Sequence, residues 1–185
     1  MNICIFCSAN SNLPTEYFDR TRELGAWIGA NGHTLVFGGC NLGLMECVAE
    51  AVHNAKGMTV GVVPSIVEKG GKVSEHVDVK ILCDNLSDRK DLMIEKGDAY
   101  ICLPGGIGTI DEWISTLSHL IVAGIENKKP IFVVNYMGMY DNLVAQLREC
   151  AHSPFARGKN IDCSHIASDT NNLIEKLNNF ISKLL

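Results

Sequence analysis

Short apolar segments alternate with longer amphipathic segments along the whole of this chain. The apolar segments are rich in β-branched and aromatic residues, as buried strands usually are. They span residues 3–8, 34–37, 58–63, 77–83, 99–103, 131–134 and 161–166. The amphipathic segments carry apolar side chains at three- and four-residue spacings, which predicts helices. They span residues 15–30, 42–55, 86–96, 109–123, 140–150 and 171–185.

Strands that alternate with helices in this way predict a parallel sheet whose two faces are both covered. The expected fold class is therefore α/β, with a doubly wound, Rossmann-like parallel sheet and helices on both faces. A chain of 185 residues can bury one sizeable core but is short for two, so we expect a single Rossmann-like domain over residues 1–185. Residues 65–75 are predicted to form a long polar loop near the functional site.

The charge of the chain argues against several classes of partner. Its 16 Lys and Arg residues face 21 Asp and Glu residues, for a formal net charge of −5, and no basic run is present that would bind a nucleic acid. No apolar stretch reaches the roughly 20 residues of a membrane span, and the first residues do not resemble a signal peptide. We expect a cytoplasmic protein that binds neither nucleic acid nor membrane.

The eight cysteines and six histidines do not predict a metal site or a redox centre. Cys4 and Cys7 form a C-x-x-C, but they lie three apart in an expected strand, where their side chains point to opposite faces. The histidines lack the spacing of a metal-binding pair. We therefore predict no metal and no cofactor.

A glycine-rich segment, Pro104-Gly105-Gly106-Ile107-Gly108-Thr109, follows the fifth apolar segment and opens a helix. Backbone N–H groups at such a helix start can converge on an anion, and the helix dipole favours negative charge there. Gly105, Gly106, Gly108 and Thr109 are the predicted phosphate-binding residues. The alternative is a tight turn that needs glycine only for its backbone angles.

A second glycine turn, which includes Gly38 and Gly39, follows the second apolar segment. Ligands of such sheets bind beyond the carboxyl ends of the strands, so this turn and Ser8, at the end of the first apolar segment, are expected to lie beside the first glycine loop. Two glycine loops on one edge would bracket a crevice of nucleotide size. Ser8, Gly38 and Gly39 are therefore predicted to bind the substrate.

Three charged side chains complete the predicted site. Glu112 lies three residues after Thr109, within the first turn of the expected helix, where the dipole also favours a carboxylate without any chemistry. Arg89 and Lys90 lie near the start of another helix, where positive charge is disfavoured, so an anionic partner would explain them. Solvent exposure explains Lys90 equally well, and Asp111 could be no more than a helix-start charge.

These motifs resemble those of the LOG ("Lonely Guy") phosphoribohydrolases, a family once labelled lysine decarboxylases. Residues 104–112 match the family pattern P-G-G-x-G-T-x-x-E in full, and residues 38–45 match G-G-G-x-x-G-L-M with Cys40 in place of the third glycine. Residues 86–90 correspond to M-H-x-R-K: Arg89 and Lys90 are kept, and Ser87 stands in place of the histidine.

The resemblance implies an enzyme that hydrolyses the N-glycosidic bond of a nucleoside 5′-monophosphate, AMP or an N6-substituted AMP such as a cytokinin riboside monophosphate. It also implies that Arg89 and Glu112 are the catalytic pair and that the protein is a homodimer. Two alternatives stay open. One is a carrier of a phosphate-bearing ligand, like the molybdenum-cofactor carriers of the same superfamily, and the other is a regulatory protein that senses a nucleotide.

Overall fold

The computed structural model describes residues 1–125, 128–156 and 164–184. The described residues form seven strands and six longer α-helices in the order that the sequence predicts, together with one short α-helix that the sequence does not predict. The strands are β1 (Asn2–Phe6), β2 (Thr34–Phe37), β3 (Met58–Pro64), β4 (Val79–Cys83), β5 (Ala99–Cys102), β6 (Ile131–Val134) and β7 (Ser164–Ala167). The helices are α1 (Thr15–Ala30), α2 (Gly43–Asn54), α3 (Ser65–Lys69), α4 (Leu86–Lys96), α5 (Ile107–Ala123), α6 (Asp141–His152) and α7 (Thr170–Ile181), with a 3-10 turn, η1 (Tyr136–Gly138).

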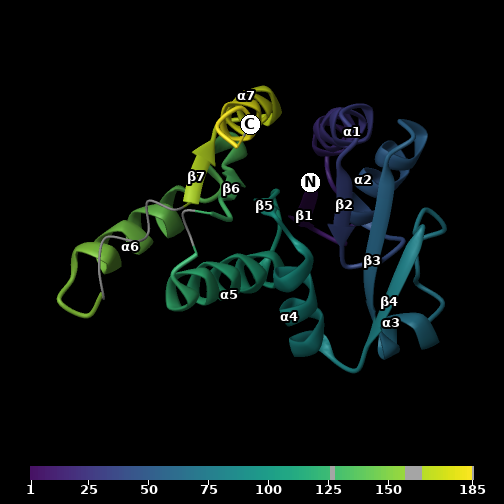
Figure 1. Cartoon of the computed structure of the whole chain (residues 1–185), viewed down its shortest axis with the longest axis horizontal. Coiled ribbons are helices and arrows are strands. Elements are labelled where there is room, and N and C mark those ends of the chain that lie inside the picture. The colour runs from purple at the N-terminus through teal and green to yellow at the C-terminus, as the bar shows by residue number, and fades with distance from the viewer. Residues whose placement is uncertain (126–127, 157–163, 185) are drawn as a thin grey trace.

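All seven strands form one parallel sheet in the order β4-β3-β2-β1-β5-β6-β7 (Figure 1). The predicted fold class is confirmed. From β1 the chain builds outward to β4 and then returns to the other side of β1 with β5. Such a reversal opens a crevice at the carboxyl ends of the two central strands, where ligands of these folds bind.

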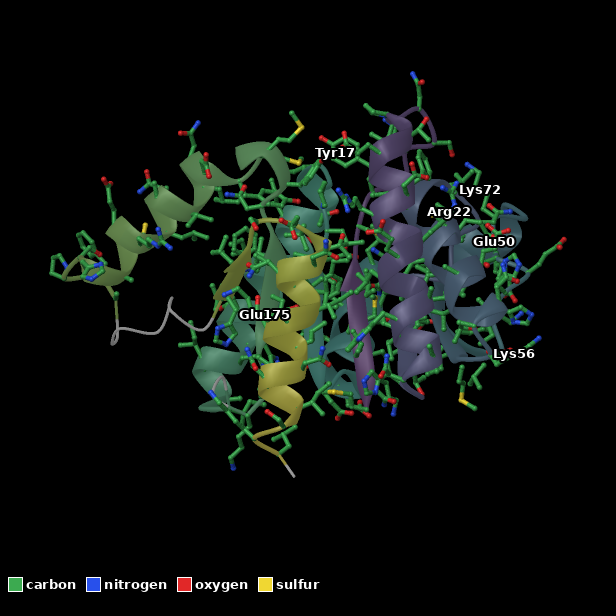
Figure 2. The ribbon with its side chains drawn as sticks, turned by 90° about the horizontal axis from the view of Figure 1, so that it is seen from above. Tyr17, Arg22, Glu50, Lys56, Lys72 and Glu175 are labelled. Carbon is green, nitrogen blue, oxygen red and sulfur yellow. The ribbon has the colours of Figure 1, made fainter. Side chains whose placement is uncertain are left out.

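Helices cover both faces of the sheet. The core on one face joins alternate side chains of β1, such as Ile3 and Ile5, to α1, α2 and α7. The core on the other face joins the intervening side chains, such as Cys4 and Phe6, to α4, α5 and α6. Figure 2 shows α7, α1 and α2 side by side on the first face. Because both faces are buried at the centre of the sheet, central strands such as β5 and β6 are apolar throughout rather than alternating, whereas the edge strands β4 and β7 are partly exposed.

Most element boundaries differ from the sequence predictions by a few residues, and three of the differences bear on the site or on the described range. Residues 65–75 are not one polar loop: they begin with α3, which follows Pro64, and Val73 pairs with Cys40 in an isolated antiparallel bridge. Helix α5 begins at Ile107 rather than at Thr109. The last strand covers residues 164–167, while residues 161–163 of the predicted segment, like residue 185 of the predicted last helix, lie outside the described residues.

The predicted orientation of the C-x-x-C is confirmed, since Cys4 and Cys7 lie in the cores of opposite faces. Burial raises the pKa of both thiols, which disfavours the reactive thiolate form. In the described residues no group of three or more histidine, cysteine and acidic side chains is arranged to hold a metal ion. No helix among those described is long and apolar enough to cross a membrane.

Candidate functional site

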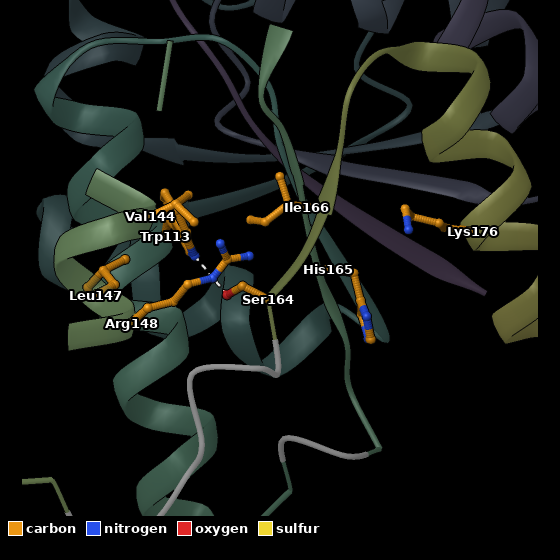
Figure 3. Close-up of a pocket in the computed structure, with 8 residues that line it drawn as sticks. All are labelled: Trp113, Val144, Leu147, Arg148, Ser164, His165, Ile166 and Lys176. Carbon is orange, nitrogen blue, oxygen red and sulfur yellow. Dashed lines mark hydrogen bonds between the residues drawn. The ribbon is translucent and has the colours of Figure 1, made fainter. Parts of the chain in front are cut away.

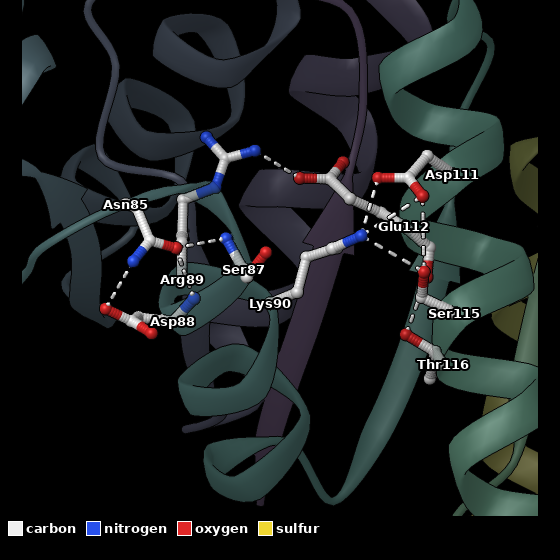
Figure 4. A network of polar contacts seen from close by, with 9 residues as sticks. All are labelled: Asn85, Ser87, Asp88, Arg89, Lys90, Asp111, Glu112, Ser115 and Thr116. Carbon is white, nitrogen blue, oxygen red and sulfur yellow. Dashed lines mark hydrogen bonds and ion pairs between the residues drawn. The ribbon is translucent and has the colours of Figure 1, made fainter.

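A buried ion pair joins the helices that follow β4 and β5. One guanidinium nitrogen of Arg89, Nη2, donates to Oε1 of Glu112 at 2.5 Å (Figure 4). The side chain of Arg89 is 14% exposed and that of Glu112 is 5% exposed. Residues that lie 23 apart in the sequence therefore meet as a nearly solvent-free charge pair, as expected of the two predicted catalytic residues.

Two helix starts bring these side chains together. Asn85 caps α4, and its side-chain oxygen accepts from the backbone N–H groups of Ser87 and Asp88. This fixes the first turn of α4, which carries Arg89. The predicted place of Glu112 in the first turn of its helix is wrong, because α5 begins at Ile107. Glu112 lies in the second turn and is buried, so the helix dipole does not account for it.

Burial raises the pKa of Glu112 above the ordinary value for glutamate, although the positive charge of Arg89 lowers it. The burial effect dominates because a carboxylate that leaves water loses hydration that a single partner does not replace. Within the described residues the buried Nε atom of Arg89 has no hydrogen-bond partner. The pair is thus a largely buried charge pair with one unpaired nitrogen and a shifted carboxyl pKa. Shifted pKa values are common at functional sites.

The second glycine turn lies against Arg89. A Cβ atom placed on Gly38 would lie 3.1 Å from Nη1 of Arg89 and 3.5 Å from the sulfur of Met45. Gly38 therefore leaves the space that the guanidinium needs. Gly39 is required by the backbone and by packing: its φ is +70°, and a Cβ atom there would lie 2.5 Å from the side chain of Val63.

The residues of the first glycine loop fall into two groups, one buried and one exposed. The N–H of Gly105 donates to the hydroxyl of Tyr140 at 3.0 Å, and the side chain of Thr109 fills the space beside Gly105. Gly105 and Thr109 are buried, whereas Gly106 and Gly108 are exposed. The exposed backbone N–H groups at the start of α5 have no carbonyl partner within the helix, so they can bind an anion.

Lys90 has an anionic partner within the protein, a possibility that the sequence analysis weighed against simple solvent exposure. Its ammonium nitrogen lies 2.8 Å from Oδ2 of Asp111 and 3.2 Å from Oγ of Ser115 on α5. The hydrogen bond from Lys90 lowers the pKa of Asp111. Lys90 thus links α4 to α5 on the outer side of the Arg89–Glu112 pair.

Ser8 follows β1 and supports the second glycine turn. Its carbonyl accepts from the N–H of Leu44 at 2.9 Å, and its hydroxyl accepts from the N–H of Asn10 at 3.1 Å. The loop after β1 therefore contacts the start of α2, while the segments that follow β2, β4 and β5 meet at Arg89 and Glu112.

Two residues of this region were missed at the sequence level. Tyr140 ties the loop after β6 to the glycine loop after β5, because its hydroxyl contacts both Gly105 and Leu103. The sulfur of Met45 lies beside Gly38, as the guanidinium of Arg89 does. Tyr140 carries no sequence signal that separates it from an ordinary core residue, whereas Met45 ends the motif over residues 38–45.

A separate pocket of about 290 Å³ lies between α5, α6 and β7 (Figure 3). Trp113, Val144, Leu147 and Ile166 line it together with Arg148, and it contains neither Arg89 nor Glu112. Two of the lining residues are hydrogen-bonded to each other, since Nε1 of Trp113 donates to the hydroxyl of Ser164 at 3.1 Å. Because the residues just before Ser164 lie outside the described part of the chain, we assign it no ligand.

Comparison with known families identifies the chain. A family model described as possible lysine decarboxylase matches residues 45–177. The chain belongs to this family. The match includes Arg89, Glu112 and the first glycine loop, and the LOG proteins that the sequence resembles are among its relatives.

Curated LOG relatives are similar over most of their length. A probable cytokinin riboside 5′-monophosphate phosphoribohydrolase of Oryza sativa subsp. japonica is 32% identical over 97% of this chain and 78% of its own. A cytokinin riboside 5′-monophosphate phosphoribohydrolase of Mycobacterium tuberculosis is 34% identical over 78% of this chain and 76% of its own.

Solved structures with the same fold include a different functional class. A molybdenum cofactor binding protein from Rippkaea orientalis superposes with a TM-score of 0.74, at 26% identity, over 97% of this chain and 96% of that one. The molybdenum cofactor carrier protein from Chlamydomonas reinhardtii has a TM-score of 0.74 at 20% identity, over 98% of each chain. The second likeness shows the fold alone.

Proposed function

We propose that this protein hydrolyses the N-glycosidic bond of a nucleoside 5′-monophosphate and releases the free base and ribose 5-phosphate. The substrate would be AMP or an N6-substituted AMP, such as a cytokinin riboside monophosphate. The buried Arg89–Glu112 pair beside an exposed helix start is the observation that carries the proposal. The names of the LOG relatives support this class of substrate.

Glu112 supplies the negative charge that this reaction needs. Cleavage of an N-glycosidic bond passes through an oxocarbenium-like state, which a carboxylate stabilises. Water adds to C1′ and gives a proton to the carboxylate, while the electron pair of the broken C1′–N bond leaves with the base. The base takes up one proton from solvent and the carboxylate releases its proton to solvent, so the net reaction consumes one water. A carboxylate with a raised pKa suits the transfer of that proton.

Arg89 and the glycine loops orient the substrate. The exposed N–H groups around Gly106 and Gly108 bind the 5′-phosphate, with Gly105 and Thr109 shaping the loop behind them. Arg89 holds the ribose phosphate or assists the departing base, and Lys90, Ser8, Gly38 and Gly39 line or support the crevice. Binding energy at the phosphate orients the distant C1′ atom, so nucleosides without phosphate should react poorly.

The homodimer that the resemblance implies and the cytoplasmic location that the sequence predicts belong to the same proposal. Ile107 and Val122 on α5 are 83% and 86% exposed. A second copy of the chain would cover apolar side chains of this kind.

Exchange of Glu112 for glutamine tests the hydrolysis. We expect the purified wild-type protein to release free base from AMP or its N6-substituted analogues, and Glu112→Gln to lower kcat by about 100-fold or more, because the amide carries no charge and accepts no proton. Glu95→Gln, which alters an exposed carboxylate on α4, is the matched control and should keep the wild-type rate. Near-normal turnover in Glu112→Gln would sink the assignment.

A ligand carrier is the second candidate, and the solved cofactor-binding structure of similar fold favours it. A carrier would bind a phosphate-bearing ligand at the same glycine loop without breaking any bond. Absence of base release across the nucleotide panel, together with measurable ligand binding, would support the carrier in place of the hydrolase. The same result would leave open a sensor that couples binding to a partner.

A further inference from the structure

The segment that follows α3 is bound to the second glycine turn along its backbone. The N–H of Asn41 donates to the carbonyl of Lys72 at 2.9 Å, and the N–H of Ser74 donates to the carbonyl of Gly39 at 2.9 Å. Between them, Cys40 and Val73 form the antiparallel bridge. This short pairing ties residues 72–74 to residues 39–41.

A side-chain hydrogen bond anchors the far end of that segment to α2. Nδ1 of His76 lies 2.7 Å from Oε1 of Glu46. A carboxylate only accepts hydrogen bonds, so the imidazole nitrogen is the donor. Glu46 directly follows Met45 in the first turn of α2. The backbone N–H of His76 also donates to the hydroxyl of the buried Ser74 at 3.1 Å.

The carboxylate of Glu46 depends on His76 for a hydrogen-bond donor. Oε2 of Glu46 is buried and has no hydrogen-bond partner among the described residues. The ring of His53 lies 5.3 Å from that of His76, centroid to centroid, and its Nδ1 lies 3.9 Å from Asp78. Loss of the His76 ring would therefore leave a partly buried carboxylate without a donor, which is costly.

The second glycine turn connects the His76–Glu46 contact to the proposed active site. Gly38 lies against the guanidinium of Arg89, and the sulfur of Met45 lies against Gly38. A turn that shifts by a few tenths of an ångström would move into the space of Arg89 or away from it. Arg89 in turn is held only 2.5 Å from Glu112, so the geometry of the pair depends on the position of the turn.

We propose that His76 and Glu46 are positioning residues for the reaction: their contact clasps residues 72–76 onto the second glycine turn and so fixes Arg89 relative to Glu112. The proposal rests on the proposed hydrolysis for its effect on turnover. The clasp itself is a structural property that is measurable without any substrate.

Three histidine variants separate the clasp from ordinary stability. His76→Ala removes the donor, and His76→Asn replaces it with a side-chain amide N–H near the position of Nδ1. His53→Ala is the matched control, since it removes the neighbouring ring but leaves the His76–Glu46 contact in place. Amide hydrogen exchange of the peptide over residues 38–45, kcat and KM for AMP, AMP affinity by calorimetry and the thermal midpoint are measured for each.

We expect faster exchange of the 38–45 peptide in His76→Ala, with kcat lowered by about 10-fold to 100-fold, because small misplacements of catalytic groups are costly. His76→Asn should restore most of the slow exchange and most of kcat. His53→Ala should have the exchange rate and kcat of the wild type even if its thermal midpoint falls. Unchanged exchange in His76→Ala would overturn the clasp. Faster exchange with wild-type kcat would overturn the link to Arg89.

Failure of the proposed hydrolysis gives a different pattern. In that case the wild-type protein releases no base, and kcat is undefined for every variant. Hydrogen exchange then still decides whether the clasp exists, and AMP affinity decides whether it acts on the site: equal affinity in the wild type and His76→Ala would overturn that action.

Discussion

At the scale of single residues, the Arg89–Glu112 pair is the most informative feature of this protein. Both side chains are largely withdrawn from water, and the removal of charges from water is costly even when they are paired. A protein that needed only stability at this position would do as well with apolar side chains. The pair is therefore best explained by chemistry that needs a carboxylate and a guanidinium side by side.

Loss of Arg89 should expose the cost of burying Glu112. We expect Arg89→Met to lower the free energy of unfolding by about 3 kcal/mol at about pH 8, because it leaves a buried carboxylate unpaired. The pKa of Glu112 is already raised in the folded protein. A raised carboxyl pKa favours folding when the group is protonated, and that contribution is lost as the pH rises through the raised pKa.

The loss should therefore be smaller at about pH 5 than at about pH 8, since a protonated Glu112 needs no partner. Urea denaturation of Arg89→Met at the two pH values measures this difference. The double variant Arg89→Met, Glu112→Gln is the control, and it should lose much less stability and show little pH dependence at this site. An equal loss at both pH values would contradict the lowering of the pKa of Glu112 by Arg89.

At the scale of elements, the first turn of α4 determines where Arg89 lies. The side chain of Asn85 accepts from Ser87 and Asp88, and its own amide donates to the carboxylate of Asp88 at 2.9 Å. Such caps satisfy backbone donors that a helix start would otherwise leave unpaired. The sequence predicted this helix from its apolar spacing, but it did not single out Asn85.

Removal of that cap should affect both stability and turnover. We expect Asn85→Ala to lower the free energy of unfolding by about 1 kcal/mol, as measured by urea denaturation, and to lower kcat because the turn that carries Arg89 frays. Asn85→Ser, which keeps a capping oxygen, should recover most of both. If Asn85→Ala unfolds at the wild-type urea concentration, the cap does not stabilise α4.

Helix α5 shows why boundaries were harder to predict than elements. Gly106 and Gly108 are poor helix formers, so the sequence placed the helix start after them, at Thr109. In the structure the helix begins at Ile107. The side chain of Thr109 packs beside Gly105, and the hydroxyl of Tyr140, which follows β6, accepts a hydrogen bond from the N–H of Gly105. The contact of Tyr140 with Gly105 joins residues 35 apart in the sequence. The earlier helix start places Glu112 in the second turn rather than in the first.

At the scale of the whole molecule, one sheet separates two apolar cores. Trp27 packs against the core on the α1 face, and Trp113 is buried in the core on the α5 face. Because the same strands contribute to both cores, neither core can come apart without disrupting the sheet. The two faces should therefore unfold together.

Single-tryptophan variants test this coupling. We expect Trp27→Phe, which reports on Trp113, and Trp113→Phe, which reports on Trp27, each to show a fluorescence transition that coincides with the loss of far-UV circular dichroism in the same variant during urea unfolding. Such coincidence is the usual sign of one cooperative unit. A fluorescence transition clearly earlier than the loss of secondary structure would mean that one face unfolds on its own and would contradict a single cooperative domain.

The sequence by itself determined the alternation of strands and helices, the parallel sheet and the two glycine loops, because these depend on local patterning and on short motifs. It also singled out Arg89 and Glu112. The tertiary structure alone decided that Arg89 meets Glu112, that Gly38 makes room for the guanidinium, that Gly39 serves packing, and that His76 binds Glu46. These contacts join distant segments, and only the packing of the strands and helices sets their distances and their separation from water.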